Sequence, residues 1–409
     1  MSDPPRRLEA AWLALPECRR VVAALCRDGR PVRFVGGAVR DTLRDPGFDP
    51  HDLDLATPEP PERVARLLAA AGLLPIPTGL AHGTVTCVLG DRRFEITTLR
   101  CDVRTDGRHA AVAWTCDFDQ DAARRDFTIN ALSLEPDGVL HDPFGGAADL
   151  ASGRIRFVGD PTTRIREDYL RILRFFRFLA SHGRPPADPA ALAACARERA
   201  GLERLSGERV RAELLKLLAA AEPGWALGLM AETSVLAQLL GEVADPARVA
   251  RLIAAFPDSD PLLRLAALVQ DAAPGPLADR LRLSRAETRR LETLQPLPPP
   301  PEAELRRLRR LDPASPLADR IRLDAARHGA TPAHHAAVAL AERFLPEPFP
   351  LSGHDLHRTG VADGPALGRL LAELRGWWAA QEPPPDRARC LAELARRRAP
   401  SLTSGPPDP

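Results

Sequence analysis

Apolar and polar residues alternate in short runs over the first 160 residues, and this pattern predicts strands interleaved with helices. Two runs, 83–89 and 93–99, alternate as half-buried strands do, and Gly90-Asp91 between them predicts a β-hairpin. Between 101 and 114 no period is sustained, so we expect a long loop there. The other predicted strands are 32–36 and 53–56, and the predicted helices are 38–44 and 61–71.

Beyond about residue 166 the strand patterns stop and apolar residues recur at helical spacing. Proline-rich breaks divide this part of the chain into several pieces. The simplest architecture is therefore an N-terminal α/β part followed by an elongated, all-helical part. The clearest helical stretches are 169–180, 209–220, 264–270 and 336–344, and the breaks lie at 183–189, 296–301, 344–350 and 383–385.

The composition is that of a globular protein, because 44% of the 409 residues are hydrophobic and 27% are charged. Aromatic residues make up only 5%, which disfavours nucleic-acid recognition by rows of stacked rings. The formal net charge of +1 disfavours indiscriminate binding of polyanions but leaves room for a local basic surface.

The seven cysteines are odd in number and none forms a CxxC motif, so we expect reduced thiols rather than a disulfide framework or a zinc site. The sequence shows no signal peptide and no apolar run approaching the roughly 18 residues of a membrane span. These features predict a cytoplasmic protein that does not insert into a membrane.

Asp52 and Asp54 flank Leu53 in a predicted strand, where residues two apart project from the same face. Two neighbouring carboxylates repel each other unless a cation lies between them, and Mg²⁺ favours such oxygen ligands. The pair is a candidate metal site, although a solvated strand edge would show the same pattern. Glu95, on a later predicted strand, is either a third acid near the metal or the partner of an arginine.

Gly36 and Gly37 stand between a predicted strand and a predicted helix that carries Arg40 in its first turn. Glycine lets a phosphate approach backbone N–H groups, and the helix N-terminus favours negative charge. Alone, the Gly-Gly pair would indicate an ordinary tight turn. Followed fifteen residues later by Asp52 and Asp54, it predicts a site that brings a triphosphate and metal ions together for phosphoryl or nucleotidyl transfer.

Three motifs, in this order, resemble the tRNA nucleotidyltransferase/poly(A) polymerase family, and within it the bacterial class II CCA-adding type. They are Gly36-Gly-Ala-Val-Arg-Asp41 with Asp52-Leu-Asp54, then Arg124-Arg-Asp-Phe-Thr-Ile-Asn-Ala131, then Glu167-Asp-Tyr-Leu-Arg-Ile-Leu-Arg174. The resemblance implies an α/β, polymerase-β-like nucleotidyltransferase head on a mostly antiparallel or mixed sheet, followed by an elongated all-α neck, body and tail. The implied bounds are 1–157 for the catalytic head, 158–225 for a neck with a nucleotide-recognising helix, 226–345 for the body, 346–400 for a tRNA-binding tail and 401–409 for a disordered end.

The resemblance also implies catalytic roles. Asp52 and Asp54 would bind the metal ions, and Gly36, Gly37 and Arg40 would hold the triphosphate of the incoming nucleotide. A tRNA 3′-hydroxyl would then attack the α-phosphate and release pyrophosphate, with Mg²⁺ as the cofactor.

The motif at 124–131 would close over the nucleotide. Arg125 is the expected nucleotide ligand, and Asn130 is expected to fix the turn. Arg124 is expected to face away, because one of two adjacent arginines on a helix generally does.

The third motif places Asp168 and Arg171 three residues apart, on one face of a predicted helix that Arg174 and Arg177 extend. An aspartate can accept the exocyclic amine of cytosine or adenine, and an arginine can donate to the neighbouring ring acceptor. Uracil and guanine present the opposite groups, so the pair would select CTP and ATP without a template. Without the other motifs, an intrahelical salt bridge on a solvated face would be the better interpretation.

Several functions share these features. The segments 90–100 and 104–114 resemble those of full CCA-adding enzymes, and the alternatives within the family are an A-adding enzyme and a poly(A) polymerase. The alternatives from other classes are a non-catalytic RNA-binding protein and a nucleotidyltransferase for small molecules. A third is a phosphohydrolase site at His328, His334-His335 and His354-Asp355, but exposed histidines are the better interpretation of these residues. The sequence leaves the oligomeric state open.

Overall fold

The computed structural model describes residues 6–79, 83–105, 110–359 and 364–398 of the chain. Contacts between Cα atoms divide the chain into two compact units, Met1–Pro246 with Asp279–Arg282, and Ala247–Ala278 with Leu283–Pro409. The predicted disordered end, 401–409, and residues 106–109 of the segment 104–114 lie outside the described residues. None of the described helices is both long and apolar enough to cross a membrane.

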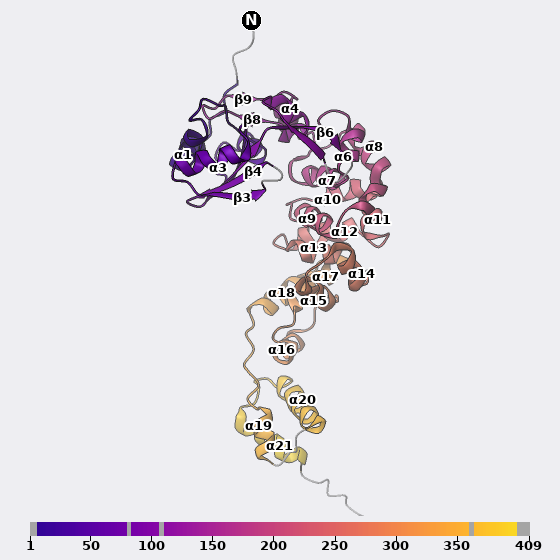
Figure 1. The fold of residues 1–409 in the computed structure, drawn as a ribbon. Helices are drawn as coiled ribbons and strands as arrows, with labels where there is room; N and C mark the ends of the chain where they lie inside the picture. Colours follow the sequence, from indigo (N-terminus) through magenta and orange to yellow (C-terminus); the bar gives the residue numbers. More distant parts are fainter. Residues whose placement is uncertain (1–5, 80–82, 106–109, 360–363, 399–409) are drawn as a thin grey trace, which may run out of the picture. The chain divides into compact units, whose positions relative to one another are not determined.

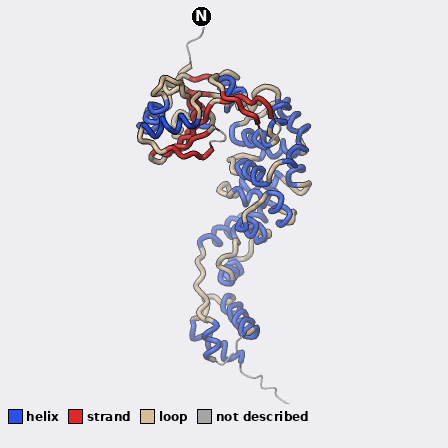
Figure 2. The backbone as a smooth tube through the Cα atoms, in the orientation of Figure 1, coloured by secondary structure: helices blue, strands red, loops and turns tan. Residues whose placement is uncertain are grey.

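The first unit begins with a seven-stranded sheet among its described residues, and strands are coloured red in Figure 2. Strand β2 pairs with β5 in parallel, and all other neighbours pair antiparallel, so the predicted mixed sheet is confirmed. In spatial order the strands are β3 (Pro75–Gly79), β4 (Thr84–Leu89), β5 (Arg92–Thr98), β2 (Asp52–Thr57), β1 (Arg33–Val35), β8 (Ser133–Leu134) and β9 (Leu140–His141), of which Figure 1 labels β3, β4, β8 and β9.

The segment predicted to be a loop at 101–114 is instead a two-stranded antiparallel pair, β6 (Arg100–Thr105) and β7 (Ala110–Trp114). The prediction was wrong because β7, with the sequence Ala-Ala-Val-Ala-Trp, is a short apolar run without alternation, so pairing with β6 and not a local pattern makes it a strand. β3 was also missed.

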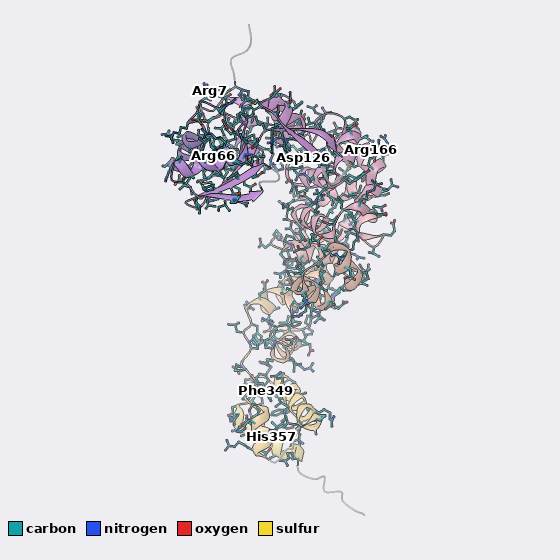
Figure 3. The ribbon with its side chains drawn as sticks, in the orientation of Figure 1. Arg7, Arg66, Asp126, Arg166, Phe349 and His357 are labelled. Atoms are coloured by element: carbon teal, nitrogen blue, oxygen red, sulfur yellow. The ribbon has the colours of Figure 1, made fainter. Side chains whose placement is uncertain are left out.

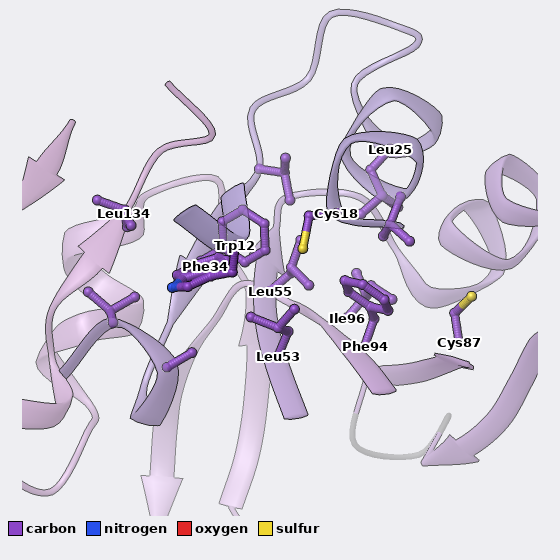
Figure 4. Close-up of a cluster of buried hydrophobic side chains, with 14 of the residues drawn as sticks. Trp12, Cys18, Leu25, Phe34, Leu53, Leu55, Cys87, Phe94, Ile96 and Leu134 are labelled. Carbon is purple, nitrogen blue, oxygen red and sulfur yellow. The ribbon is translucent and has the colours of Figure 1, made fainter. Parts of the chain in front are cut away.

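One face of the sheet is covered by an apolar core. Leu53 and Leu55 of β2 are fully buried in it with Phe34, Phe94 and Ile96 of the neighbouring strands (Figure 4). The 3-10 helix η1 (Ala11–Ala14), α1 (Pro16–Leu25) and α3 (Pro61–Ala70) close this core. Because side chains alternate along a strand, burying Leu53 and Leu55 turns Asp52 and Asp54 to the opposite, open face.

Besides the sheet and the pair β6–β7, the described residues of the first unit form mainly helices and their connections (Figure 1). Helix α7, which the sequence predicts at 169–180, packs its phenylalanines against Phe127 and Phe157 of the head and contacts α9 and α10. The helices are α2 (Gly37–Arg44), α4 (Phe118–Ala123), η3 (Thr128–Asn130), α5 (Gly146–Ser152), α6 (Pro161–Glu167), α7 (Leu170–His182), α8 (Pro189–Glu198), η4 (Arg199–Arg204), α9 (Gly207–Leu218), α10 (Gly224–Glu232) and α11 (Val235–Leu240).

The helix predicted across the third motif is interrupted. Helix α6 ends at Glu167, Asp168 has an extended backbone with φ −155° and ψ 107°, and α7 begins at Leu170. The Asp168 side chain accepts the backbone N–H of Leu170 at 3.1 Å, which replaces a helical bond at this junction. The expected placement of Asp168 and Arg171 on one helix face is therefore wrong, because Asp168 precedes the helix that carries Arg171.

The described residues of the second unit form helices. One apolar cluster joins α16, α17 and α18, and another joins α19, α20 and α21. The remaining helices of the chain are α12 (Pro246–Ala255), α13 (Pro261–Leu268), α14 (Pro274–Leu281), α15 (Arg285–Thr293), α16 (Glu302–Leu311), α17 (Leu317–His328), α18 (Pro332–Arg343), α19 (Gly353–Arg358), α20 (Pro365–Ala379) and α21 (Arg387–Arg398).

The histidines considered for a phosphohydrolase site lie in this unit. His328, His335 and His354 are exposed as expected, but His334 is buried and its Nε2 lies 3.1 Å from Asp324. Asp355 accepts the N–H of Ser352 and pairs with Arg387. Among the described residues no group of three or more His, Cys, Asp or Glu side chains is arranged to hold a metal.

Candidate active site

A cavity of about 460 Å³ in the first unit brings most of the predicted site residues together. Every predicted site residue except Asp52 lines it. Asp126 also belongs to its wall and is labelled in Figure 3. From the predicted set, the wall contains Gly36, Gly37, Arg40, Asp54, Arg125, Asp168, Arg171, Arg174 and Arg177, and it is completed by Arg124, Asp126, Asn130, Leu170, Phe178 and Arg209.

The cavity wall carries an excess of positive charge, since seven of its residues are arginines and three are aspartates. Such a surface attracts a polyanion in a protein whose overall charge is close to zero. The chemistry of the wall therefore fits a polyphosphate better than a neutral or cationic ligand.

The glycine turn lies directly beside Asp54, because Val35 of β1 pairs with Asp54 of β2. Gly36 follows with φ 72°, and a Cβ at this position would lie 3.3 Å from Asp54 Oδ2 and 3.6 Å from Arg125 Nη1. Glycine is required here both by its backbone and by the space that it leaves. Helix α2 starts at Gly37, so its first N–H groups face the region beside the carboxylate.

Three carboxylates share the open face of the sheet. In the register of β2 and β5, Asp54 lies opposite Glu95, and Asp52 lies two residues before Asp54 on β2. Asp54 faces the cavity and is exposed there, but the surrounding protein atoms partly desolvate its carboxylate. This desolvation raises the pKa of Asp54, and the charges of Glu95 and Asp52 raise it further, while the charge of Arg125 lowers it. The arginines nearby thus do not offset the desolvation and mutual repulsion of the carboxylates, and a bound cation would supply the missing positive charge.

The donor set fits Mg²⁺. This ion commonly takes one or two protein carboxylates and completes its octahedron with water and substrate phosphate oxygens. Asp52 and Asp54 project from the same strand face and could provide those carboxylates. Glu95 forms a salt bridge with Arg93 while its charge acts on Asp54, so it has features of both roles expected for it.

Arg40 is held from two sides at the cavity wall. Its Nη1 donates to Asn130 Oδ1 at 2.7 Å, and its Nε and Nη2 donate to Asp41 at 2.9 and 2.7 Å. His182 Nε2 lies 3.1 Å from the same Asp41 carboxylate. Burial alone would raise the pKa of Asp41, but the hydrogen bonds from His182 and Arg40 outweigh it and lower that pKa to about 2.

We predict that Asp41→Asn destabilises the protein by roughly 2 kcal/mol at neutral pH. The folded-state pKa lies below the ordinary value of 3.8, so the stabilisation is complete above about pH 4 and is lost as the pH falls towards 2. Urea unfolding at pH 7 and at pH 2 measures this, and the two proteins should converge at the lower pH. Asp28→Asn, at an exposed salt bridge with Arg63, is the control and should change stability little at either pH. A difference between Asp41→Asn and the wild type that did not depend on pH would contradict the assignment.

Arg124 and Arg125 both line the cavity, so the expectation that Arg124 faces away is wrong. Helix α4 ends at Ala123, and the angular spacing of helical residues no longer applies beyond it. Both guanidinium groups share the buried carboxylate of Asp121, which Arg124 contacts at 2.7 Å and Arg125 at 3.3 Å. Asn130 donates to Asp126 at 3.0 Å and accepts from Arg40, which agrees with a role in fixing the turn.

The two predicted base-recognition residues do not bond to each other through their side chains in this structure; each has its own partner. Arg171 pairs with Glu167 and donates to the carbonyl oxygens of Arg164 and Arg124 at 3.0 and 3.1 Å. Asp168 Oδ2 accepts from Arg209 Nη2 at 2.7 Å. Both residues still line the same cavity.

Arg174 and Arg177 are held by buried acids that sequence reasoning did not assign. Arg174 Nε donates to Asp126 at 2.6 Å, and Arg177 lies 3.1 Å from Glu213 of α9. Phe178 lies beneath these arginines, with the Arg177 guanidinium 4.3 Å from its ring centre. Asp126 was visible within the motif at 124–131, whereas Arg209 and Glu213 had no signal in the sequence.

Comparisons with known proteins agree with this architecture. Residues 32–156 match the family described as the poly A polymerase head domain, and residues 188–245 match the probable RNA and SrmB-binding site of polymerase A. These matches and the fold define the class, a nucleotidyltransferase head followed by an RNA-binding helical segment. Among solved structures, the CCA-adding enzyme of Bacillus stearothermophilus in complex with CTP is 25% identical, with a TM-score of 0.74 over 94% of this chain and 98% of that one.

Two curated relatives define the family within this class. The CCA tRNA nucleotidyltransferase 1, mitochondrial, of Homo sapiens is 36% identical over 375 residues, which is 86% of this chain and 83% of the relative. The CCA-adding enzyme of Levilactobacillus brevis is 39% identical over 215 residues, 51% of this chain and 52% of the relative. The chain belongs to the family of CCA-adding tRNA nucleotidyltransferases.

Proposed function

We propose that this protein adds CCA to the 3′ end of tRNA, taking CTP and ATP as substrates and releasing pyrophosphate without a nucleic-acid template. One observation carries the proposal: the glycine turn, Arg40, Asp54 and the arginines of α7 line a single cavity. A triphosphate at the glycine turn would lie beside Asp54, and its base could extend towards Asp168 and Arg171.

In this proposal the chain's own residues position the reactants. The N-terminus of α2 and Arg40 would hold the triphosphate, and Asp52 and Asp54 would hold Mg²⁺, which when bound neutralises phosphate charge and lowers the pKa of a coordinated hydroxyl. A bond forms between the tRNA 3′ oxygen and the α-phosphorus, the bond to the bridging oxygen breaks, pyrophosphate leaves and the hydroxyl proton goes to solvent. Arg125 faces the same carboxylate and would neutralise charge on the transferred group.

The proposal extends to the remaining parts of the chain and to its location. The neck at 158–225 would select the base, the body at 226–345 would connect it to the tail, and the tail at 346–400 would contact tRNA. We place the protein in the cytoplasm, on the cysteine pattern described above. Its relatives include mitochondrial enzymes, so fractionation of cells is the measurement that tests this part.

The function is tested by sequencing the products that the protein forms on three tRNA transcripts, ending before the first C, after CC, and after CCA. We expect all extended products to end at CCA and the complete transcript to remain unchanged. Addition to the CC transcript alone would indicate an A-adding enzyme, and long A tracts would indicate a poly(A) polymerase. No incorporation from either nucleotide, with Mg²⁺ present, would refute the proposal.

We predict that Arg209→Ala weakens base selection. Arg209 holds the Asp168 carboxylate in the cavity, and because both side chains are partly exposed this ion pair contributes about 1 kcal/mol. The preference for CTP over UTP, measured as the ratio of kcat/KM values, should fall about fivefold. Arg209→Lys should retain part of it.

Arg166→Ala is the matched control, because Arg166 (labelled in Figure 3) forms an equally short salt bridge with Glu198 but does not line the cavity. Its nucleotide preference should equal that of the wild type. If Arg209→Ala also kept the wild-type preference, Arg209 would have only a structural role.

A further inference from the structure

A second, smaller cavity of about 260 Å³ adjoins the first. The two share Asp54, Arg124 and Arg125, and the smaller one is completed by Thr84 of β4, Thr97 of β5 and Arg100 at the start of β6, with apolar edges from β1 and β2. Neither the glycine turn nor Arg40 lines the smaller cavity. It therefore lies against Asp54, and the residues that would hold the triphosphate are not part of its wall.

An exposed tryptophan, Trp114, adjoins residues of this cavity without being part of its wall. Trp114 pairs directly with Arg100 across the β6–β7 ladder, so the two side chains are neighbours on one face. Its ring rests on Gly83, the residue before Thr84, where a Cβ would come within 2.6 Å of the ring atoms. Trp114 is nevertheless 48% exposed. An indole ring that packs against the backbone on one part and is about half exposed offers a surface on which a planar base can stack.

We infer that this smaller cavity, with Trp114 beside it, binds the 3′-terminal nucleotide of the RNA acceptor, and that the terminal base stacks on Trp114. The inference rests on the proposed function and assigns the place of the second substrate. In nucleotidyl transfer the attacking hydroxyl and the leaving pyrophosphate lie in line, on opposite sides of the α-phosphorus. With the triphosphate at the glycine turn, in-line attack requires a hydroxyl site that is next to Asp54 but separate from that turn, and the smaller cavity meets both conditions.

The chemistry and size of the cavity agree with this ligand. Arg100 carries the charge that a phosphodiester requires, and the hydroxyl groups of Thr84 and Thr97, 3.0 Å apart, can bond to a ribose. A volume of about 260 Å³ is below the roughly 300–1,000 Å³ of sites that enclose a whole small-molecule ligand. The sugar and phosphate would occupy it, and the base would emerge from it against the indole, as single-stranded RNA bases stack on aromatic side chains.

The test uses the full chain and two RNA hairpins that mimic the tRNA acceptor arm and end in CC. One is complete, and the other has an abasic terminal nucleotide that keeps its ribose. At saturating ATP, the kcat/KM value for the complete RNA should fall about tenfold or more in Trp114→Ala, while the KM for ATP stays within about twofold. Trp114→Phe should retain most of the wild-type value.

The abasic RNA isolates the stacking contact. For the wild type, the kcat/KM value should fall on the abasic RNA by about the factor that Trp114→Ala causes on the complete RNA. The kcat/KM value of Trp114→Ala should be the same on both RNAs, because the ring and the base would form one interaction. Trp114→Leu keeps an apolar side chain on Gly83 without a stacking surface and should behave like Trp114→Ala. Val88→Ala, at another exposed apolar residue of the same sheet, is the control and should match the wild type.

Two outcomes would overturn the inference. In the first, removing the ring and removing the base would lower kcat/KM by independent factors that multiply. In the second, Trp114→Leu would distinguish the complete RNA from the abasic RNA as strongly as the wild type does. A wild-type protein that does not extend the complete RNA would refute the proposed function itself. The two failures are thus separate.

Discussion

We expect Asp54→Asn to lower the incorporation of CTP and ATP at least about a thousandfold while the head stays folded. Asp54 lies 3.3 Å from the position of a Cβ on Gly36, next to the place proposed for the triphosphate, and it projects from the strand face that carries Asp52. Losing a metal-binding carboxylate removes several kcal/mol of transition-state stabilisation, which corresponds to a loss of this size. Rates measured with labelled nucleotides on a tRNA ending before CCA would show it.

The same substitution should leave stability unchanged or increase it, and the sign follows from the pKa. The pKa of Asp54 is raised in the folded protein, so its ionisation costs free energy as the pH rises from the ordinary carboxyl value through the folded-state value. At pH 7 the wild type bears this cost in full and the asparagine variant does not. In thermal melts without metal, Asp54→Asn should therefore melt no lower than the wild type, and the difference should disappear in acid.

Added Mg²⁺ separates the two proteins further. A ligand that binds only the folded state stabilises it, so Mg²⁺ with CTP should raise the melting temperature of the wild type and have much less effect on the variant. Asp91→Asn is the control. Asp91 lies in the turn between β4 and β5, and its exposed carboxylate pairs with His51, so this variant should resemble the wild type in both assays. Activity of Asp54→Asn within tenfold of the wild type would exclude Asp54 as a metal ligand.

The largest loss of stability is expected for Asp126→Ala. This buried carboxylate accepts hydrogen bonds from the Phe127 N–H at 2.9 Å, from Asn130 at 3.0 Å and from Arg174 at 2.6 Å. Burial alone would raise its pKa, but the charge of Arg174 and these hydrogen bonds lower it, so the group is ionised and its bonds are charge-assisted. Removing one partner of a buried ion pair costs about 3–5 kcal/mol.

Urea unfolding of the full chain, followed by a signal from the first unit, measures this loss. Asp126→Asn should lose less, because an amide oxygen can still accept one of the N–H groups. Asp137→Ala is the control: its salt bridge with Arg7 is more than half exposed on both sides, and its removal should change the stability little. If Asp126→Ala were as stable as the control, the network around Arg174 would not support the cavity wall.

Most of the sheet could be predicted because its signals are local. The runs at 83–89 and 93–99 and the turn between them became β4 and β5, and burial of Leu53 and Leu55 follows from alternation alone. The pair β6–β7 could not be found in this way, since its strands are defined by pairing between segments on either side of the undescribed residues and by a shifted register.

The candidate site shows the same division. Its motifs identified residues that the structure places around one cavity, but not the bonds between them. Arg209 and Glu213 lie 41 and 36 residues beyond their partners Asp168 and Arg177, so only the packing of α9 on α7 brings them there. The break at Asp168 was in principle visible, because aspartate is common at helix N-termini, where its side chain accepts an N–H two or three residues on, yet the apolar spacing continued across it.

The strand β2 illustrates how two kinds of selection can act on one short peptide. Leu53 and Leu55 support the core, while Asp52 and Asp54, between and beside them, face the open side of the sheet. Adjacent residues of this strand are thus under selection for different reasons, alternately for folding and for chemistry. A lineage that lost the activity would be free to change every second residue of this strand and would keep the others for as long as it kept the fold.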